Sequence, residues 1–371
     1  MSVYQEHLDR IMAAVNIEPV DRIPVMQSGS ACNAAFCGKT LKEYCDDPVI
    51  NTDCNLEAAR MWGEVDGTQA TCFQPRNMAR MWLGRVLMPG HDLPENELWQ
   101  MAEKEVVSQD DYDIILEEGY QAFYAEIMNR IGNPIDEPEV KAFRDYTPTA
   151  IARFMEAGIP SFNGGSLFSP IELFTGGRTL INFFADDLFD FPEKVEEAFD
   201  IVQKSNLETW DKMYSSMQNK PAGVWIGGWR GTPDVLSKDM FERFSWKYLV
   251  EIFDLVTSHG IVPLWHLDAC WDKGLPYFRE LPRGKSILGF DGQTDIFLAA
   301  EVLGGHTCIM GDVNATMLSF DTTDEVDAYC KRLIDACGPT GYIMSSGCDA
   351  PYNAKLENVQ VLCESVRKYG R

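Results

Sequence analysis

TCIMGDVNATMLSFDTTDEVDAYCKRLIDACGPTGYIMSSG, residues 307–347, is the stretch that indicates the class of fold. Short apolar runs at residues 307–313 and 342–347 have the length of buried strands. Between them, apolar residues recur at spacings of three and four, which is the period of one helix face. These residues are Val326, Cys330, Leu333, Ile334 and Cys337. A strand, a helix and a second strand predict a parallel pair, because parallel strands need a crossover connection.

Both ends of this helix carry sequence signals. Thr322 and Glu325 have the spacing of a capping box, in which each side chain accepts a hydrogen bond from the other residue's backbone N–H. Gly338 and Pro339 end the helix, because glycine allows a left-handed turn and proline has no N–H to donate. The sequence therefore predicts a helix over residues 322–337.

The same alternation of apolar run and amphipathic stretch extends along the chain from about residue 159. The runs are residues 159–163, 222–228, 261–268, 286–291, 307–313 and 342–347, and two earlier ones are residues 23–27 and 63–70. Eight strands that alternate with helices predict an α/β fold of the (β/α)8 TIM barrel type. The number of strands and helices does not exclude an open doubly wound sheet, which is the alternative fold.

No Ser/Gly/Pro-rich linker divides the chain, so we expect residues 1–371 to form a single TIM-barrel domain. A barrel of this type needs about 250 residues. The surplus consists of an N-terminal helical extension and a polar region, residues 94–158, which we expect to be a helical insertion.

The charge balance excludes two classes of partner. With 32 Lys and Arg against 57 Asp and Glu, the net charge of −25 repels phosphate backbones and anionic headgroups, so we expect neither nucleic acid nor membrane as a partner. No apolar run approaches the roughly 20 residues that span a bilayer, and the N-terminal residues are charged where a signal peptide is apolar. We expect a cytoplasmic protein.

Polar residues at the predicted strand ends indicate where the chemistry lies, because a barrel places its active site there. Alternation along residues 261–268 puts His266 and Asp268 on one face. Together with Cys348, which follows the last strand, they supply the three protein ligands of a catalytic zinc site. The alternative for His266 is a hydrogen-bonded core histidine.

Two carboxylates and several tryptophans lie at the same strand ends. Asp291 and Asp312 are candidate catalytic residues that handle protons or support a ligand, although Asp beside Gly is also a common turn former. The tryptophans at these strand ends are Trp225, Trp229, Trp265 and Trp271. Trp229 and Trp265 are the candidates for a flat apolar wall against a planar substrate, with core packing as the alternative. No Walker A, Gly-x-Gly-x-x-Gly, His-Glu-x-x-His or Gly-x-Ser-x-Gly motif is present, which disfavours kinases, nicotinamide dehydrogenases, zincins and ordinary serine hydrolases.

A set of short motifs, in this order, resembles the uroporphyrinogen decarboxylase superfamily over nearly the whole chain. The motifs are DRIPV at 21–25, PGHDLP at 89–94 with LWQ at 98–100, HLD at 266–268, MGDV at 310–313, and SSGC at 345–348 with ENV at 357–359. The resemblance implies a barrel of eight β/α units with its site at the carboxyl ends of the strands.

The superfamily contains uroporphyrinogen decarboxylases and cobalamin-dependent methyltransferases, and their residues differ. Decarboxylases resemble one another in an arginine-rich segment after the first strand that binds acetate and propionate groups. The corresponding residues here, 25–33, contain no arginine. This difference disfavours decarboxylation.

The methyltransferases hold zinc with a His-x-Cys pair and a distant Cys in a Gly-Cys segment. The matching positions are His266, Asp268 and Cys348, so Asp stands in place of the first Cys. Exchange of a thiolate for a carboxylate leaves a stronger Lewis acid, which suits the polarisation of an ether oxygen.

The overall likeness is to the methyltransferases of O-demethylase systems. It implies transfer of a methyl group from a methoxylated aromatic or similar small methyl donor to the cob(I)amide of a partner corrinoid-binding protein, with zinc as cofactor. The alternatives are transfer from methylcobamide to a thiol or folate, uroporphyrinogen decarboxylation, and a non-catalytic subunit that docks a corrinoid protein.

Overall fold

A six-stranded parallel sheet forms most of the barrel wall in the computed structural model, which describes residues 1–371. Its strands follow one another in the order β5 to β10. They are β5 (Ser166–Phe168), β6 (Gly223–Gly228), β7 (Val262–Leu267), β8 (Ile287–Phe290), β9 (Cys308–Met310) and β10 (Tyr342–Ile343). Consecutive parallel neighbours joined by helices are the arrangement that a TIM barrel requires.

Two short strands at the start of the chain close the barrel. They are β1 (Met26–Gln27) and β2 (Gly67–Thr68), which pair in parallel. On one side, Val25 pairs with Met344 beyond β10, and the Met26 N–H donates to the Met344 carbonyl at 2.9 Å. On the other side, Thr68 pairs with Ser161 ahead of β5. The prediction of a (β/α)8 barrel is confirmed, and the open sheet is excluded.

The third barrel strand differs in position from the predicted residues 159–163. The structure has an isolated bridge at Ser161, and regular pairing begins only at β5. Gly164 and Gly165 separate the two, and Gly165 has a φ of +136°, which disfavours other residues. A side chain at Gly164 would lie 2.2 Å from Pro221, so the backbone passes too closely there for any residue but glycine.

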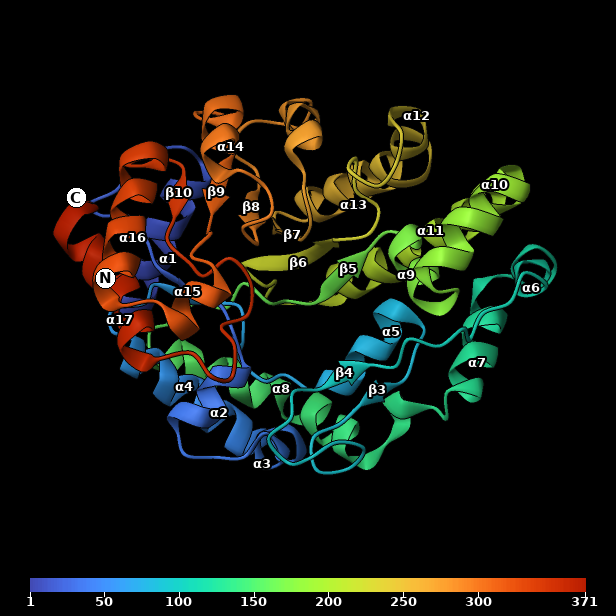
Figure 1. The fold of residues 1–371 in the computed structure, drawn as a ribbon, viewed down its shortest axis with the longest axis horizontal. Helices are drawn as coiled ribbons and strands as arrows, with labels where there is room; N and C mark the ends of the chain where they lie inside the picture. Colours follow the sequence, from blue (N-terminus) through green and yellow to red (C-terminus); the bar gives the residue numbers. More distant parts are fainter.

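Helices form the outer layer around the sheet (Figure 1). They are α4 (Pro48–Trp62), α8 (Pro138–Glu156), α11 (Pro192–Ser216), α13 (Lys247–Ser258), α14 (Ile296–Leu303), α16 (Thr323–Cys337) and α17 (Leu356–Tyr369). The helix predicted over residues 322–337 is confirmed as α16, and both hydrogen bonds of its capping box are present.

The remaining helices and strands complete the fold. They are α1 (Val3–Val15), α2 (Ala31–Phe36), α3 (Leu41–Asp46), α5 (Ala79–Trp82), α6 (Asp111–Glu118), α7 (Tyr120–Arg130), α9 (Pro170–Gly177), α10 (Leu188–Asp190), α12 (Lys238–Phe241) and α15 (Ala315–Phe320). Residues 75–78, 134–136 and 272–279 form 3-10 helices, and residues 182–187 and 242–246 form π-helical segments. Strands β3 (Val86–Leu87) and β4 (Gln100–Met101) form an antiparallel pair. Residues 94–158 thus hold β4, α6, α7 and α8, and α8 packs against α4 in the outer layer.

Helix α1 closes the amino end of the barrel. Its side chains Ile11, Ala14 and Val15 pack against the inward-facing residues of the strands. These strand residues include Met26, Phe162, Leu264, Ile287, Met310 and Ile343. Because this end is filled with apolar side chains, a small molecule can reach the barrel interior only from the carboxyl ends of the strands.

No helix is both long and apolar enough to cross a membrane.

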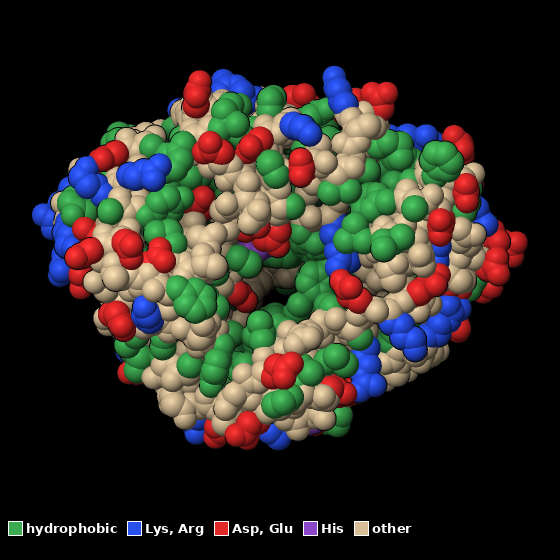
Figure 2. All heavy atoms as spheres, viewed as in Figure 1, with side chains coloured by type: hydrophobic (Ala, Val, Ile, Leu, Met, Phe, Trp, Pro, Cys, Tyr) green, Lys and Arg blue, Asp and Glu red, His purple; other side chains and the backbone are tan.

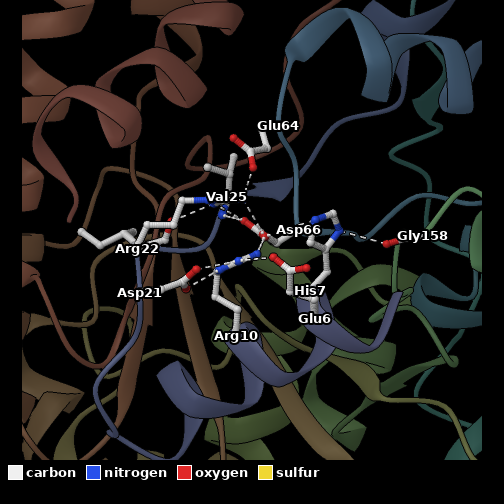
Figure 3. Close-up of polar contacts among 10 residues, drawn as sticks. Glu6, His7, Arg10, Asp21, Arg22, Val25, Glu64, Asp66 and Gly158 are labelled. Atoms are coloured by element: carbon white, nitrogen blue, oxygen red, sulfur yellow. Dashed lines mark hydrogen bonds and ion pairs between the residues drawn. The ribbon is translucent and has the colours of Figure 1, made fainter. Parts of the chain in front are cut away.

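An ion cluster holds α1 in this position (Figure 3). The Asp66 carboxylate, at the start of β2, is fully buried and accepts hydrogen bonds from Arg10 of α1 at 2.6 Å and from Arg22 at 2.6 and 2.9 Å. It also accepts from the Val25 N–H at 2.8 Å. Arg10 in turn donates to Asp21 at 2.7 and 2.8 Å. The Asp21-Arg22 motif therefore supports the barrel rather than the chemistry.

Candidate metal centre and its cavity

A cavity of about 270 Å³ lies at the carboxyl ends of the strands. It opens at the centre of the face in Figure 2, where apolar and acidic side chains surround the hollow. The small or polar lining residues are Ser28, Gly29, Ser30, Gln69, Ala70, Asn163, Ser166, His266, Asp268, Cys348 and Asp349, and the large apolar ones are Phe73, Met78, Met81, Trp82, Trp99, Trp225 and Trp229. The cavity thus combines polar groups with aromatic rings.

His266, Asp268 and Cys348 meet in this cavity. His266 is the fifth residue of β7, Asp268 follows the strand, and Cys348 comes from the loop after β10. The His266 Nε2 atom lies 3.1 Å from Asp268 Oδ1 and 3.5 Å from Cys348 Sγ. All three ligand atoms lie within 4.8 Å of one another. Barrel closure therefore brings together an imidazole and a thiol that are 82 residues apart in the sequence.

These three side chains fit a tetrahedral zinc ion. Ligand atoms at zinc distances of about 2.0 to 2.3 Å and tetrahedral angles lie roughly 3.3 to 3.8 Å from one another. The two distances to His266 Nε2 are 3.1 and 3.5 Å, close to that range. The cavity leaves room for a fourth ligand, which is the arrangement of a catalytic zinc site rather than a structural one.

The charge environment of His266 favours a positively charged partner. Burial alone lowers the pKa of the His266 imidazole, but the Asp268 carboxylate and Cys348 raise it by more, so the pKa lies well above its usual range. The ring also stacks on Trp225, with centroids 5.3 Å apart, which sets its orientation.

A chain of tryptophans forms the aromatic side of the cavity. Trp229 lies between Trp225 and Trp82, with ring centroids 5.4 and 5.2 Å away, so the three rings make a continuous wall that reaches His266. We call Trp82, Trp225 and Trp229 the tryptophan wall. Phe73 and Trp99, 5.5 Å apart, form a second aromatic pair in the lining.

Trp265, predicted as part of this wall, lies elsewhere. Its side chain is fully buried and packs on Phe253 of α13 and on Phe278. The prediction is wrong because the alternation that turns His266 into the barrel turns its neighbour Trp265 outward, against the helices. Trp225, the third residue of β6, occupies the wall position instead.

Asp291 supports the loop that carries the ligands. Its carboxylate accepts a hydrogen bond from the Ala269 N–H at 3.2 Å and from the Gln293 N–H at 2.8 Å. Burial raises its pKa, and the nearby Asp268 charge adds to the increase. Asp291 does not line the cavity, so its contacts fit a residue that positions the Asp268 loop rather than one that touches substrate.

Asp312, the other predicted catalytic carboxylate, faces away from the cavity. It is buried and accepts a hydrogen bond from the Tyr329 hydroxyl of α16 at 2.7 Å. Burial raises the pKa of Asp312 to about 7. Asp312 is not among the residues that line the cavity, because the chain after β9 turns its side chain toward the outer helix layer, so its role in proton handling stays a prediction.

Two features of the site were missed in the sequence. The first is Glu172 of α9, a buried carboxylate that accepts hydrogen bonds from the N–H groups of Trp229, Arg230 and Gly231 at 3.1 to 3.2 Å. Burial raises the pKa of Glu172 to about 7. The carboxylate thereby holds the loop after β6 and the Trp229 ring that it carries.

The second is Asp349, which lines the cavity beside Cys348 and accepts a hydrogen bond from Ser30 at 3.3 Å. Burial raises its pKa. An acidic residue directly after the Gly-Cys segment was the available signal, but only the structure shows that its side chain reaches the cavity.

Comparison with known proteins places this chain in a family. Residues 156–369 match the family described as Uroporphyrinogen decarboxylase (URO-D). The chain belongs to this family. A curated relative, the uroporphyrinogen decarboxylase of Sulfurimonas denitrificans, is 32% identical over 95 residues, which are 24% of this chain and 26% of that protein. The match thus spans about a quarter of the relative's length.

A solved structure shares the whole fold. A methyltransferase from Methanosarcina mazei aligns over 98% of both chains with a TM-score of 0.70 and 16% sequence identity. This likeness agrees with the (β/α)8 barrel and with the placement of the N-terminal elements that lie outside the family match.

Proposed function

We propose that this protein is a methyltransferase that moves a methyl group from a small donor, such as a methoxylated aromatic, to the cob(I)amide of a partner corrinoid protein. The proposal depends above all on the convergence of His266, Asp268 and Cys348 in one cavity. A neutral imidazole, a carboxylate and a thiolate are a donor set for zinc, and the fold matches that of a methyltransferase.

The chemistry explains why an ether donor needs this cluster. Transfer breaks the bond between the methyl carbon and oxygen, and the electron pair stays on an oxygen that is a poor leaving group at neutral pH. A zinc ion held by His266, Asp268 and Cys348 would stabilise that negative charge as a Lewis acid. The tryptophan wall would orient the ring of the donor, and the side chains that surround it would keep water from the reacting atoms.

The cavity disfavours decarboxylation of a polycarboxylate. Ser28, Gly29 and Ser30, from the segment that is arginine-rich in decarboxylases, line the cavity here. No Lys or Arg is among the lining residues. Several acetate and propionate groups would therefore enter without counter-charges, beside Asp268 and Asp349, which is electrostatically unfavourable.

The proposal is tested by metal content and methyl transfer together. The purified protein should contain about one zinc per chain, as elemental analysis would show. Substitutions His266→Ala and Cys348→Ser should reduce both the zinc content and the rate of corrinoid methylation by at least about 100-fold.

Cys270→Ser is the matched control, because Cys270 follows β7 but lies outside the cluster. It should retain zinc and activity. A protein without zinc whose His266→Ala variant methylates the corrinoid at the wild-type rate would contradict the role of the metal. The absence of methylation with any donor would contradict the transfer itself.

A further inference from the structure

The charge of the cavity selects among methyl donors. Its lining includes two carboxylates, Asp268 and Asp349, and neither Lys nor Arg. Basic side chains lie at the outer edge of the opening in Figure 2, but they do not belong to the lining. If Asp268 binds the metal, Asp349 remains as a negative charge that faces the ligand.

Arg230, which follows Trp229, does not compensate this charge. Its side chain is outside the cavity lining. The negative charges that interact with the Arg230 guanidinium are those of Glu172 and Glu103. A carboxylate on the donor would therefore lose its hydration without gaining an ion pair, which is costly. The net charge of −25 adds to this repulsion.

The aromatic lining favours the opposite charge. The tryptophan wall and the pair of Phe73 with Trp99 place five aromatic rings in the lining of one small cavity. Indole faces attract cations through the ring quadrupole, and tryptophan is the strongest of the aromatic side chains in this respect. Aromatic rings combined with a carboxylate are the usual chemistry for the recognition of an ammonium group.

We infer that the methyl donor carries a positively charged amine or quaternary ammonium group, which lies between the tryptophan wall and Asp349. This inference rests on the proposed methyl transfer. It narrows the donor from methoxylated aromatics in general to those with a cationic substituent, and it excludes methoxybenzoates as good substrates.

Three ligands of the same size and different charge test the inference. They are 4-methoxybenzylamine, 4-methoxybenzyl alcohol and 4-methoxybenzoate, and their binding to the purified full-length protein is measured by calorimetry and by quenching of tryptophan fluorescence. We expect the amine to bind about tenfold or more tightly than the alcohol, and the benzoate at least about tenfold more weakly than the alcohol. Binding of the benzoate as tight as that of the amine would overturn the inference.

The substitution Asp349→Asn should remove most of the preference for the amine, because it deletes the charge but keeps an oxygen for Ser30. The control Glu301→Gln removes one exposed charge on α14, far along the chain from the cavity segments, and should preserve the preference. An Asp349→Asn variant with an unchanged preference would contradict the role of Asp349. Where that variant does not fold, the wild-type ligand series decides.

The binding series contains no corrinoid protein, so the two proposals fail separately. A preference for the amine without methylation of the corrinoid would contradict the transfer and leave the charge selectivity standing. Methylation of the corrinoid from 4-methoxybenzoate at the rate observed with the amine would contradict the selectivity and leave the transfer standing.

Discussion

At the scale of single residues, carboxylates with raised pKa values occupy different positions in this barrel. Asp349 lines the cavity and Glu172 holds a loop of the cavity wall, whereas Asp312 hydrogen-bonds to an outer helix. All three have raised pKa values because of burial. A raised pKa therefore does not by itself distinguish a residue that lines the cavity from one that faces the outer helices.

Asp312 makes stability depend on pH. Its folded pKa of about 7 exceeds the unfolded value of 3.8, so the folded state binds the proton more tightly. Stability is therefore highest below the unfolded pKa and decreases as pH rises toward the folded pKa. From pH 5 to pH 8, the free energy of unfolding of the wild type should fall by about 2 to 3 kcal/mol more than that of the Asp312→Asn variant. Urea unfolding of both proteins at both pH values measures this difference. An equal decrease in wild type and variant would contradict the assignment.

At the scale of elements, the loop after β6 is positioned by a helix that comes earlier in the chain. Glu172 of α9 accepts three backbone N–H groups of this loop, and the loop brings Trp229 into the cavity. The arrangement resembles a helix N-cap, in which a side chain accepts hydrogen bonds from backbone N–H groups. Here the N–H groups belong to an irregular loop instead of the first turn of a helix. It explains why a buried acid stands in an otherwise apolar helix.

We expect Glu172→Gln to loosen this loop, because the amide group points an N–H where the loop needs an acceptor. Stability should decrease by about 1 to 3 kcal/mol, and binding of the preferred ligand should weaken by about tenfold. Denaturant unfolding and tryptophan fluorescence measure the two effects. The exposed Glu301→Gln variant undergoes the same chemical change and should alter neither, whereas wild-type ligand binding by Glu172→Gln would argue against the loop's role.

At the scale of the whole molecule, the two ends of the barrel have separate tasks. Helix α1 and the ion cluster around Asp66 fill the amino end, and the cavity occupies the carboxyl end. The separation lets the carboxyl end carry polar and charged groups without loss of the packed core, since stability is provided at the opposite end.

Asp66→Asn should therefore destabilise the protein without a specific effect on the site. The substitution replaces the buried carboxylate that Arg10 and Arg22 share with a neutral amide. The free energy of unfolding should decrease by about 3 to 5 kcal/mol, because two arginines lose their buried negative partner. The control is Asp53→Asn, which breaks an exposed pair with Arg153 and should cost at most about 1 kcal/mol. Equal losses of unfolding free energy for the two variants would refute this view of the cluster.

The amino-acid sequence by itself determined the repeating pattern of the fold and one helix in detail. The apolar runs, the helical period of residues 322–337 and the Thr322–Glu325 capping box are local, and they act through backbone geometry that spans only a few residues. The pairing of His266 with Asp268 on one face is local in the same sense. Strand limits near Gly164 were less well predicted, because Gly165, with a φ of +136°, departs from strand geometry between the bridge at Ser161 and β5.

Only the tertiary structure decided which distant groups meet. Barrel closure brings Cys348 to His266, turns Trp265 and Asp312 toward the helices, and places Trp225, Glu172 and Asp349 at the site. The physical reason is that the direction of a side chain at a strand end depends on register and on how the following loop turns. Those features are set by contacts between residues far apart in the chain, and no local pattern encodes them.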